Sequence, residues 1–208
     1  KRLLNPMEFI PTAEKTGLIV PIGEWVLNTA CRVCKKMQDR YGRKIIISVN
    51  ISPVQLREKD FVNTVAKALS NAGLDASSLE LEITENIFID NYDVSIGVLQ
   101  RIKDMGVRIA LDDFGSGYSS LGYLKKLPIN ILKIDKTFID KIDPGASDAD
   151  ITDSIISLMH KLKIVILAEG VETEKQYKYL KESNCDLIQG HFLGEPVPEE
   201  LLGSIIEK

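Results

Sequence analysis

Residues 107–114 read Val-Arg-Ile-Ala-Leu-Asp-Asp-Phe (VRIALDDF), a short apolar run that ends in two adjacent carboxylates. A run of this length and composition is typical of a strand that is buried on both faces of a sheet. Five other segments likewise combine apolar or β-branched residues with a polar residue at the end. The further predicted strands are Lys44–Asn50, Leu79–Glu85, Ile131–Asp135, Ile164–Glu169 and Asp186–Gln189.

The segments between these strands have helical periodicity. Asn5 and Pro6 are typical of a helix start, and Gly42 predicts the end of a long helix that begins near Ile22. Asp60 is expected to cap the helix that follows it. The remaining predicted helices cover 92–105, 148–162 and 172–182, with a last one after Pro198. Alternating β and α segments predict a parallel sheet covered by helices, either open or closed into a barrel.

The number of predicted strands fits two architectures. A closed (β/α)₈ barrel needs eight strands and typically about 250 residues, whereas this chain has 208 residues and six candidate strands. An open parallel sheet of six strands needs nothing more, so the count leaves both architectures open. The length suits one sizeable core, and we therefore expect a single domain over residues 1–208.

The composition argues against several classes of function. Hydrophobic residues make up 44% of the chain and charged residues 27%, which is the balance of an ordinary globular protein. The net charge of −4 argues against a nucleic acid polymer as a partner, because such a surface needs clustered Lys and Arg. No run of about 18 apolar residues occurs, so we expect no membrane contact by this domain.

The cysteines and histidines give little sign of a zinc site. Three cysteines cannot form a complete disulfide framework and suit the reducing cytoplasm, where we expect the domain to lie. Cys31 and Cys34 form a C-x-x-C inside a predicted helix, which favours buried small side chains over a zinc or redox site. His160 and His191 lack the spacing of zinc ligands, and we expect His160 to be a packing residue of its helix.

Polar residues mark the end of every predicted strand. In a parallel α/β domain all carboxyl ends of strands lie at one face, where active sites form. An acid after one strand is commonly a helix cap or a loop residue, but six successive strands with this feature predict a shared site. The residues are Asn50, Glu82 with Glu85, Asp112 with Asp113, Lys133 with Asp135, Glu169, and Gln189.

The chemistry of this group predicts a divalent-metal site. Five or more carboxylates repel one another unless cations bind among them. Oxygen donors with one amide suit Mg²⁺ or Mn²⁺ rather than zinc. Asp112 and Asp113 are expected to reach different cations, as in sites where two ions about 3.5–4 Å apart hold a phosphoryl group. Lys133 could stabilise the nucleophile or the developing charge, although an ordinary ion pair is the competing interpretation.

Residues 112–121, Asp-Asp-Phe-Gly-Ser-Gly-Tyr-Ser-Ser-Leu, resemble the DDFG-x-GYSSL segment of EAL domains, the bacterial cyclic di-GMP phosphodiesterases. The other motifs of that family occur in the family's order over essentially the whole chain, and the combined set is highly specific. They are PMEFIP (6–11), VNIS (49–52), ELEITE (80–85), LKID (132–135), AEGVE (168–172) and QG (189–190).

This resemblance implies a fold and an activity. The implied fold is a modified (β/α)₈ TIM-like barrel, with six of its eight strands expected in this chain. The implied reaction is the hydrolysis of cyclic di-GMP to linear pGpG with Mg²⁺ or Mn²⁺, two ions being expected. The first two strands and the Glu-Ala-Leu motif that names the family would then precede Lys1, and without that motif the chain as given is expected to be inactive.

The resemblance also implies roles for single residues. Asn50, Glu82 and Asp112 match metal ligands, Asp113 matches a ligand of the second ion, and Asp135 matches a residue close to the metals. Lys133 and Glu169 match the catalytic residues that position or activate the water. Gln189 matches a substrate-binding residue, and Glu85 matches the anchor of a loop that begins at Gly115 and couples the site to dimerisation.

Two departures keep an alternative open. The family's Glu-Ala-Leu and the Arg that follows it do not occur in residues 1–208, and His191–Pro196 differs from the aromatic-rich segment that follows Gln-Gly in many members. A catalytically inactive cyclic di-GMP receptor or regulatory module is the alternative to an enzyme. Expected partners are cyclic di-GMP, a second copy through the 115–127 region, and fused sensory or GGDEF domains. A larger membrane-anchored protein, of which this domain is a cytoplasmic part, is compatible with these expectations.

Overall fold

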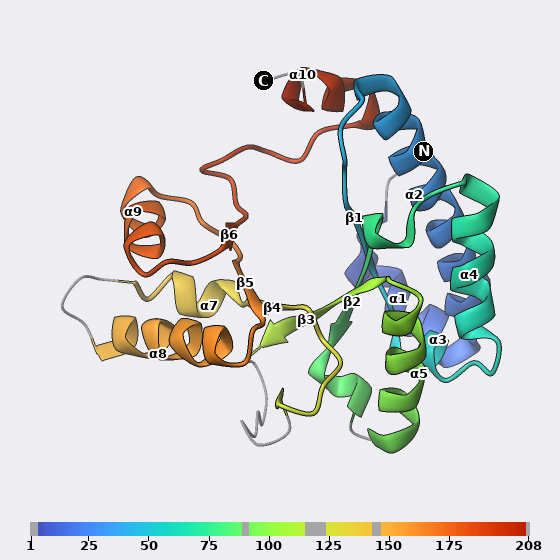
Figure 1. Cartoon of the computed structure of the whole chain (residues 1–208), viewed down its shortest axis with the longest axis horizontal. Coiled ribbons are helices and arrows are strands. Elements are labelled where there is room, and N and C mark those ends of the chain that lie inside the picture. Colours follow the sequence, from blue (N-terminus) through green and yellow to red (C-terminus); the bar gives the residue numbers. More distant parts are fainter. Residues whose placement is uncertain (1–3, 89–91, 115–123, 143–146, 207–208) are drawn as a thin grey trace. The chain divides into compact units, whose positions relative to one another are not determined.

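The computed structural model describes residues 4–88, 92–114, 124–142 and 147–206 (Figure 1). The chain divides into two compact units, Lys1–Ile109 and Ala110–Lys208. The elements of the first unit are α1 (Pro6–Thr16), α2 (Ile19–Tyr41), β1 (Ile47–Asn50), α3 (Pro53–Leu56), α4 (Phe61–Ala72), η1 (Ala76–Ser78), β2 (Leu79–Thr84), η2 (Glu85–Phe88) and α5 (Tyr92–Asp104).

Strand β3 (Arg108–Phe114) crosses the boundary between the two units. The elements that follow it are β4 (Ile131–Ile134), α7 (Lys136–Ile139), α8 (Ser147–Lys161), β5 (Val165–Ala168), α9 (Glu174–Glu182), β6 (Leu187–Ile188), η3 (Glu199–Leu201) and α10 (Leu202–Ile206). All six predicted strands are therefore confirmed, and each is shorter than its predicted segment. The predicted alternation of strands and helices is also confirmed.

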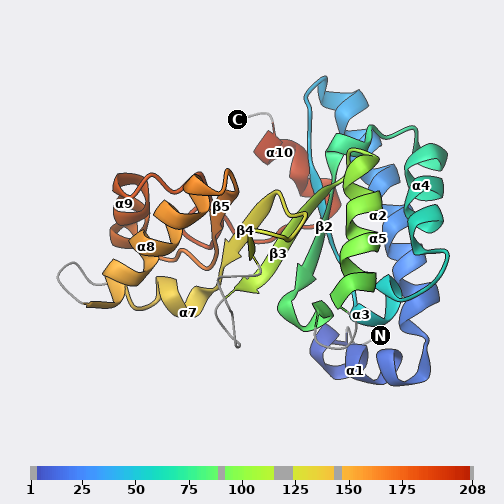
Figure 2. The ribbon, with the colours of Figure 1, turned by 60° about the horizontal axis from the view of Figure 1, so that its bottom comes forward.

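In the first unit, β1 and β2 pair in parallel, with Ile47 opposite Leu79 and Asn50 opposite Glu82. Alternate residues of β2 point to opposite faces, and Leu79, Leu81 and Ile83 are buried on one of them. The helices α2, α4 and α5 lie on one side of these strands in both ribbon views (Figures 1 and 2). Their buried side chains include Leu27, Val65 and Leu99.

The helix starts in this unit can be compared with those predicted from the sequence. The Asn5 side chain accepts a hydrogen bond from the Met7 amide at 3.0 Å, as predicted for a helix start. Helix α2 begins at Ile19 rather than near Ile22. Pro21 is tolerated in its first turn, because the amides there have no partner within the helix and the missing N–H of proline costs no hydrogen bond. Asp60 occupies the predicted N-cap position of α4, but its carboxylate accepts from the Asn63 side chain at 3.2 Å and makes no hydrogen bond to the backbone of the helix.

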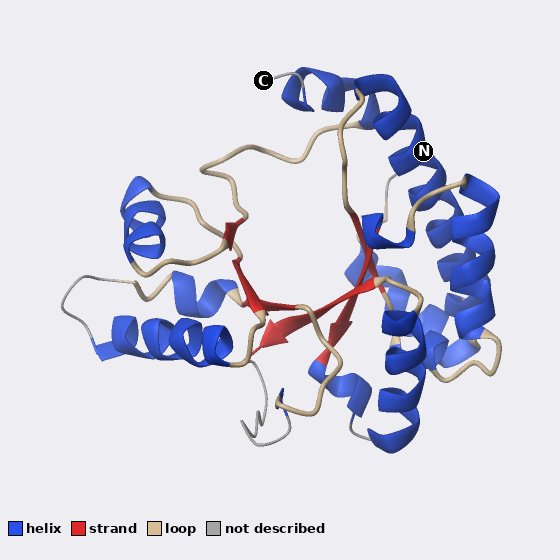
Figure 3. Cartoon of the chain, in the orientation of Figure 1, coloured by secondary structure: helices blue, strands red, loops and turns tan. Residues whose placement is uncertain are grey.

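In the second unit, β3, β4, β5 and β6 pair in parallel in chain order. Strand β4 is buried at all four residues, as expected for a strand covered on both faces. Helices α7, α8 and α9 lie on one side of these strands, and loops connect the strand ends to them (Figure 3). The carboxyl ends of β3, β4 and β5 therefore lie together at one edge of this unit.

Candidate active site

The first unit carries two of the predicted ligands, and β1 and β2 place them side by side. Asn50 and Glu82 are register partners at the carboxyl ends of these strands, and the Ile51 amide donates to the Glu82 carbonyl at 2.9 Å. Both side chains are at least partly exposed, on the face opposite the buried Leu81. An amide oxygen and a carboxylate are thus adjacent.

A second polar pair lies one step back on the same face. Ser48 and Glu80 are register partners, and the Ser48 hydroxyl donates to Glu80 Oε1 at 3.1 Å. Arg108 Nε lies 3.1 Å from Glu80 Oε2, which leaves the Glu80 side chain only 6% exposed. Charged groups this deep need partners, so Glu80 is satisfied as a structural ion pair beneath Glu82. Glu80 was not among the predicted site residues, although it alternates with Glu82 in ELEITE.

In the second unit, Asp112 and Asp113 lie inside β3 rather than after it. The pairing of β3 with β4 shifts between Leu111 and Phe114, so that three steps along β3 match two steps along β4. This is a β-bulge, which redirects side chains and is common near active sites. Asp113 has φ of 55°, a conformation that few non-glycine residues adopt, and its amide donates to Asp112 Oδ1 at 2.9 Å.

The bulge gives the two carboxylates different surroundings. Asp112 is largely buried, with 13% of its side chain exposed, whereas Asp113 is exposed. Although Asp113 is exposed as a residue, its carboxyl is partly removed from water by its neighbours, which raises its pKa; the negative charges of Asp112 and Asp135 raise it further, while Lys133 lowers it. The three carboxylates are therefore close enough to repel one another. The prediction that adjacent aspartates face different ways is consistent with this geometry.

Lys133 is the buried cation of the cluster and contacts two of its carboxylates. It lies on β4, exposes 5% of its side chain, and places Nζ 3.1 Å from Asp112 Oδ1 and 2.8 Å from Glu169 Oε1. A buried ammonium with two carboxylates is charge-compensated. The ion pair that competed with a catalytic role is thus present, and the two are compatible because Lys133 orients both acids.

Asp135 also lies at this edge, but it has a structural task. Its Oδ1 accepts from the Thr137 amide at 2.8 Å and from the Thr137 hydroxyl at 2.5 Å, which caps the short helix α7. A helix-capping carboxylate is the ordinary interpretation of an acid after a strand. Asp135 still raises the pKa of Asp113 through its charge, so it remains part of the electrostatic cluster.

Gln189 lies just beyond β6, beside a small cavity of about 240 Å³. Its backbone joins the neighbouring segments: the Gln189 amide donates to Ala168 O at 2.8 Å, and its carbonyl accepts from the Val171 amide at 3.0 Å. Gly190 is needed next, since a Cβ there would lie 2.2 Å from the Val171 carbonyl oxygen. Lys136, Glu172 and His191 line the same cavity.

Glu85 begins η2 directly after β2. The loop it is expected to anchor, and most of the 115–127 region expected to form a dimer interface, lie outside the described residues; of that region, Leu124 and Leu127 are buried. Glu85 as a loop anchor and the homodimer therefore stay predictions.

Two other predictions concern residues away from this edge. Cys31 and Cys34 are buried and unpaired by disulfides, as expected for small core side chains. The expectation for His160 was wrong: its side chain is 38% exposed, and Nε2 lies 3.0 Å from Asp186 Oδ2. The same Asp186 oxygen accepts the Ile166 amide at 2.8 Å, so His160 binds a residue that holds the edge of β5. A cavity of about 750 Å³ between α8 and α9 adjoins it.

Each unit carries oxygen donors of the kind that a hard cation prefers. Asn50 and Glu82 offer two oxygen donors in one unit, and the self-repelling Asp112, Asp113 and Asp135 offer carboxylates in the other. No three Asp, Glu, His or Cys side chains form a ready-made metal cluster within the part of the chain that the structure describes. None of the described helices combines the length and apolar character needed to cross a membrane.

Parallel βα units with a charged cluster at the strand ends define an α/β protein of the barrel-forming class. The family model for the EAL domain matches residues 1–196. The chain belongs to the EAL domain family, which confirms the predicted fold class, a modified (β/α)₈ barrel, with six of its strands among the described residues.

The relatives include proteins with described activities. The bifunctional diguanylate cyclase/cyclic di-GMP phosphodiesterase MucR of Pseudomonas aeruginosa is 45% identical over 204 residues, covering 98% of this chain and 30% of that protein. The cyclic di-GMP phosphodiesterase NbdA of the same organism is 40% identical, covering 94% of this chain and 25% of that protein. The chain thus spans less than a third of these relatives.

A solved structure titled PaMucR phosphodiesterase, c-di-GMP complex, superposes with a TM-score of 0.89 at 45% identity, covering 96% of this chain and 81% of that chain. A calcium and cyclic di-GMP complex of BlrP1 from Klebsiella pneumoniae superposes with a TM-score of 0.77 at 26% identity, covering 85% of this chain and 44% of that chain. These likenesses extend over nearly all of the described fold.

Proposed function

We propose that this chain is the phosphodiesterase part of a signalling enzyme that hydrolyses cyclic di-GMP to linear pGpG. The observation that carries the proposal is the buried Lys133, which holds Asp112 and Glu169 within 3.1 Å and 2.8 Å at the carboxyl ends of three strands. Support comes from family membership and from relatives whose names state this activity.

The reaction needs a water to attack one phosphorus while the bond from that phosphorus to the 3′ oxygen breaks. The oxygen of the attacking water bonds to phosphorus and remains there as the new oxygen of the 5′-phosphate. The leaving 3′ oxygen takes up a proton. Glu169 is the proposed acceptor of the water's proton, because it lies at a strand end and is oriented by Lys133. Lys133 would also oppose negative charge that develops on the phosphoryl group.

Two Mg²⁺ or Mn²⁺ ions would lower the pKa of the attacking water and neutralise the phosphate. Asn50, Glu82, Asp112 and Asp113 are the proposed ligands, and Asp135 the nearby acid; their oxygen donors suit such ions. Gln189 is proposed to contact the nucleotide from the edge of its cavity. Fusion to sensory or GGDEF domains, dimerisation through 115–127 and a cytoplasmic location complete the proposal.

The test is product analysis with the full-length protein that contains this chain. Wild type and Glu169→Gln are incubated with cyclic di-GMP and Mn²⁺, and pGpG is separated by liquid chromatography. The proposal expects pGpG from wild type and a loss of at least about 100-fold in the variant. Tight binding of cyclic di-GMP by wild type with no pGpG would instead establish the receptor alternative.

A further inference from the structure

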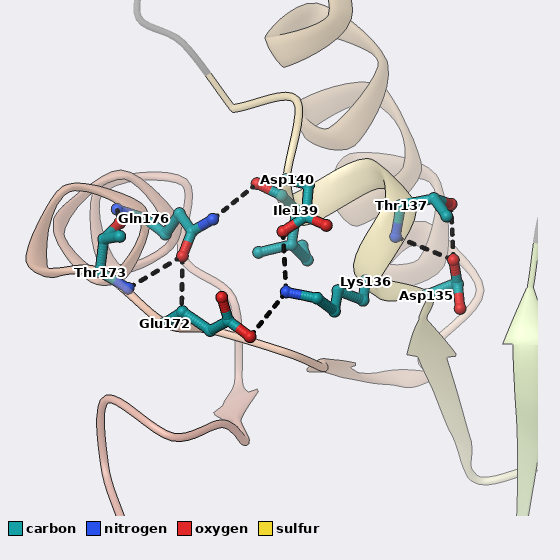
Figure 4. A network of polar contacts seen from close by, with 8 residues as sticks. All are labelled: Asp135, Lys136, Thr137, Ile139, Asp140, Glu172, Thr173 and Gln176. Carbon is teal, nitrogen blue, oxygen red and sulfur yellow. Dashed lines mark hydrogen bonds and ion pairs between the residues drawn. The ribbon is translucent and has the colours of Figure 1, made fainter.

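A ring of polar contacts joins the loop after β5 to the helix after β4 (Figure 4). Lys136, the first residue of α7, places Nζ 2.8 Å from Glu172 Oε1 and 3.0 Å from Asp140 Oδ1. Hydrogen bonds to Glu172 and then to Asp140 raise the pKa of Lys136, so the ammonium is the favoured form. One side chain thus connects its own helix to the neighbouring loop.

The side chain of Gln176 closes the ring on its other side through hydrogen bonds to backbone groups. Gln176 of α9 accepts hydrogen bonds on Oε1 from the Glu172 amide at 2.9 Å and the Thr173 amide at 3.0 Å. Its Nε2 donates to the Ile139 carbonyl of α7 at 3.2 Å. Gln176 is 8% exposed, so these bonds are shielded from water. The loop 170–173 is therefore held to α7 at two points, one ionic and one buried.

Packing at Gly170 shows how closely Lys136 follows this loop. Gly170 has φ of +70°, and a Cβ built on it would lie 2.5 to 2.8 Å from the aliphatic carbons of Lys136. The next residue, Val171, hydrogen-bonds to Gln189 and to Phe192 through its amide and carbonyl. Movement of this loop would therefore move Glu169 on one side and the Gln189 segment on the other.

We infer that Lys136 is a positioning residue, which fixes the loop 170–173 and thereby the placement of Glu169 and Gln189. The inference rests on the proposed function for its effect on turnover, but the ordering of the loop does not depend on that function. Lys136 and Glu172 are 42% and 48% exposed, so their ion pair contributes little to global stability. We therefore expect the ion pair to affect the ordering of the loop 170–173 and not the stability of the whole fold.

The test combines hydrogen exchange with kinetics on the full-length protein. In Lys136→Ala, peptides covering 170–176 should exchange severalfold faster, because the loop loses its ion pair to α7 and its Val171 and Glu172 amides, which bond to Gln189 and Gln176, open more often. The kcat for cyclic di-GMP should fall about tenfold or more with a smaller change in KM, because small displacements of a catalytic group are costly. Lys136→Arg, which keeps a cation, should restore both.

Lys178→Ala is the matched control. Lys178 pairs with Glu174 at the same 2.8 Å on α9 of the same unit, but both side chains are about two-thirds exposed and the pair is internal to one helix. This variant should change neither exchange in 170–176 nor kcat. Glu172→Gln should resemble Lys136→Ala, and the double variant should be no worse than either, since one interaction is lost in all three.

The possible outcomes separate the two proposals. Unchanged exchange in Lys136→Ala would overturn the inference whatever the activity. Faster exchange with unchanged kcat in an active enzyme would show a loop that does not position the catalytic group, and would also overturn it. Absence of pGpG from wild type would remove the proposed function, and the exchange result would still decide whether Lys136 orders the loop.

Discussion

The Nζ atom of Lys133 lies 2.8 Å from the Oε1 atom of Glu169, and this contact bridges the carboxyl ends of β4 and β5. The register explains it: Lys133 is the partner of Leu167, and Glu169, two residues on, shares the face of Leu167. Because Lys133 is only 5% exposed, its charge acts on Glu169 with little screening by solvent.

Replacement of Lys133 by Met keeps most of the aliphatic volume and removes the charge. Asp112 and Glu169 would then lose their common cation, and the proposed proton acceptor would lose its orientation. We expect kcat for cyclic di-GMP to fall by about 100-fold or more. Lys178→Met, in an exposed pair, should have no effect. A Lys133→Met enzyme with nearly normal kcat would remove Lys133 from the catalytic machinery.

Replacement of Arg108 by Ala leaves the buried Glu80 without its cation. The Glu80 side chain is 6% exposed, and among the described hydrogen bonds it would keep only the one from the Ser48 hydroxyl. We expect Arg108→Ala to lower the free energy of unfolding by about 2–3 kcal/mol. This is less than the loss of a fully buried ion pair would cost, because Arg108 is 29% exposed. Urea unfolding measures it. Adding Glu80→Gln should recover part of the loss, whereas a further loss would contradict this explanation.

Replacement of Gly23 by Ala tests the packing of Gln55 against α2. A Cβ at Gly23 would lie 1.8 Å from Gln55 Nε2, so the buried Gln55 must move. Gln55 forms a capping box with Ser52, which starts α3 directly after β1. We expect a lower thermal midpoint, by several degrees for a loss of about 1–2 kcal/mol.

Gly97 provides the control for this substitution. It lies in α5, and a Cβ there would meet no atom within 4 Å. Gly97→Ala should therefore stabilise the protein by about 0.5–1 kcal/mol through helix propensity. If Gly23→Ala raised the thermal midpoint as Gly97→Ala does, the steric account of Gln55 would be wrong.

The thiol of Cys31 provides a pH prediction. Burial, and then the neighbouring Cys34, raise the pKa of Cys31 from 9.0 to about 11. The folded state favours the neutral thiol, so this contribution to stability is present below pH 9 and is lost as the pH rises toward 11. At pH 8 we expect alkylation of Cys31 by iodoacetamide to be about 100-fold slower in native than in urea-unfolded protein. Equal rates would contradict the burial of this thiol.

The fold could be predicted because its signals are local and repeated. Apolar runs such as VRIALDDF identify strands wherever they pack, and parallel topology then brings strand ends to one edge. Asp112, Lys133 and Glu169 were predicted to meet on this basis, and in the second unit they do. Asn50 and Glu82 were likewise predicted to lie at strand ends on one edge of the sheet, and register places them opposite each other.

Other features depend on packing that no periodicity encodes. The bulge at Asp113 with positive φ follows from the pairing of β3 with β4, and an Asp-Asp dipeptide alone does not reveal it. The contact of His160 with Asp186 joins residues 26 positions apart. The capping boxes that begin at Ser52 and Thr173 did carry a signal, because S/T-x-x-Q is typical of helix starts.

The most direct test of the central claim is the fate of cyclic di-GMP on the full-length protein with Mn²⁺, compared with the same protein carrying Lys133→Met or Glu169→Gln. Catalysis by the Lys133, Glu169 and Asp112 cluster predicts that wild type converts cyclic di-GMP to pGpG and that both variants lose at least about 100-fold of that rate while remaining folded. Turnover of both variants at the wild-type rate, or binding by wild type without any pGpG, would contradict it.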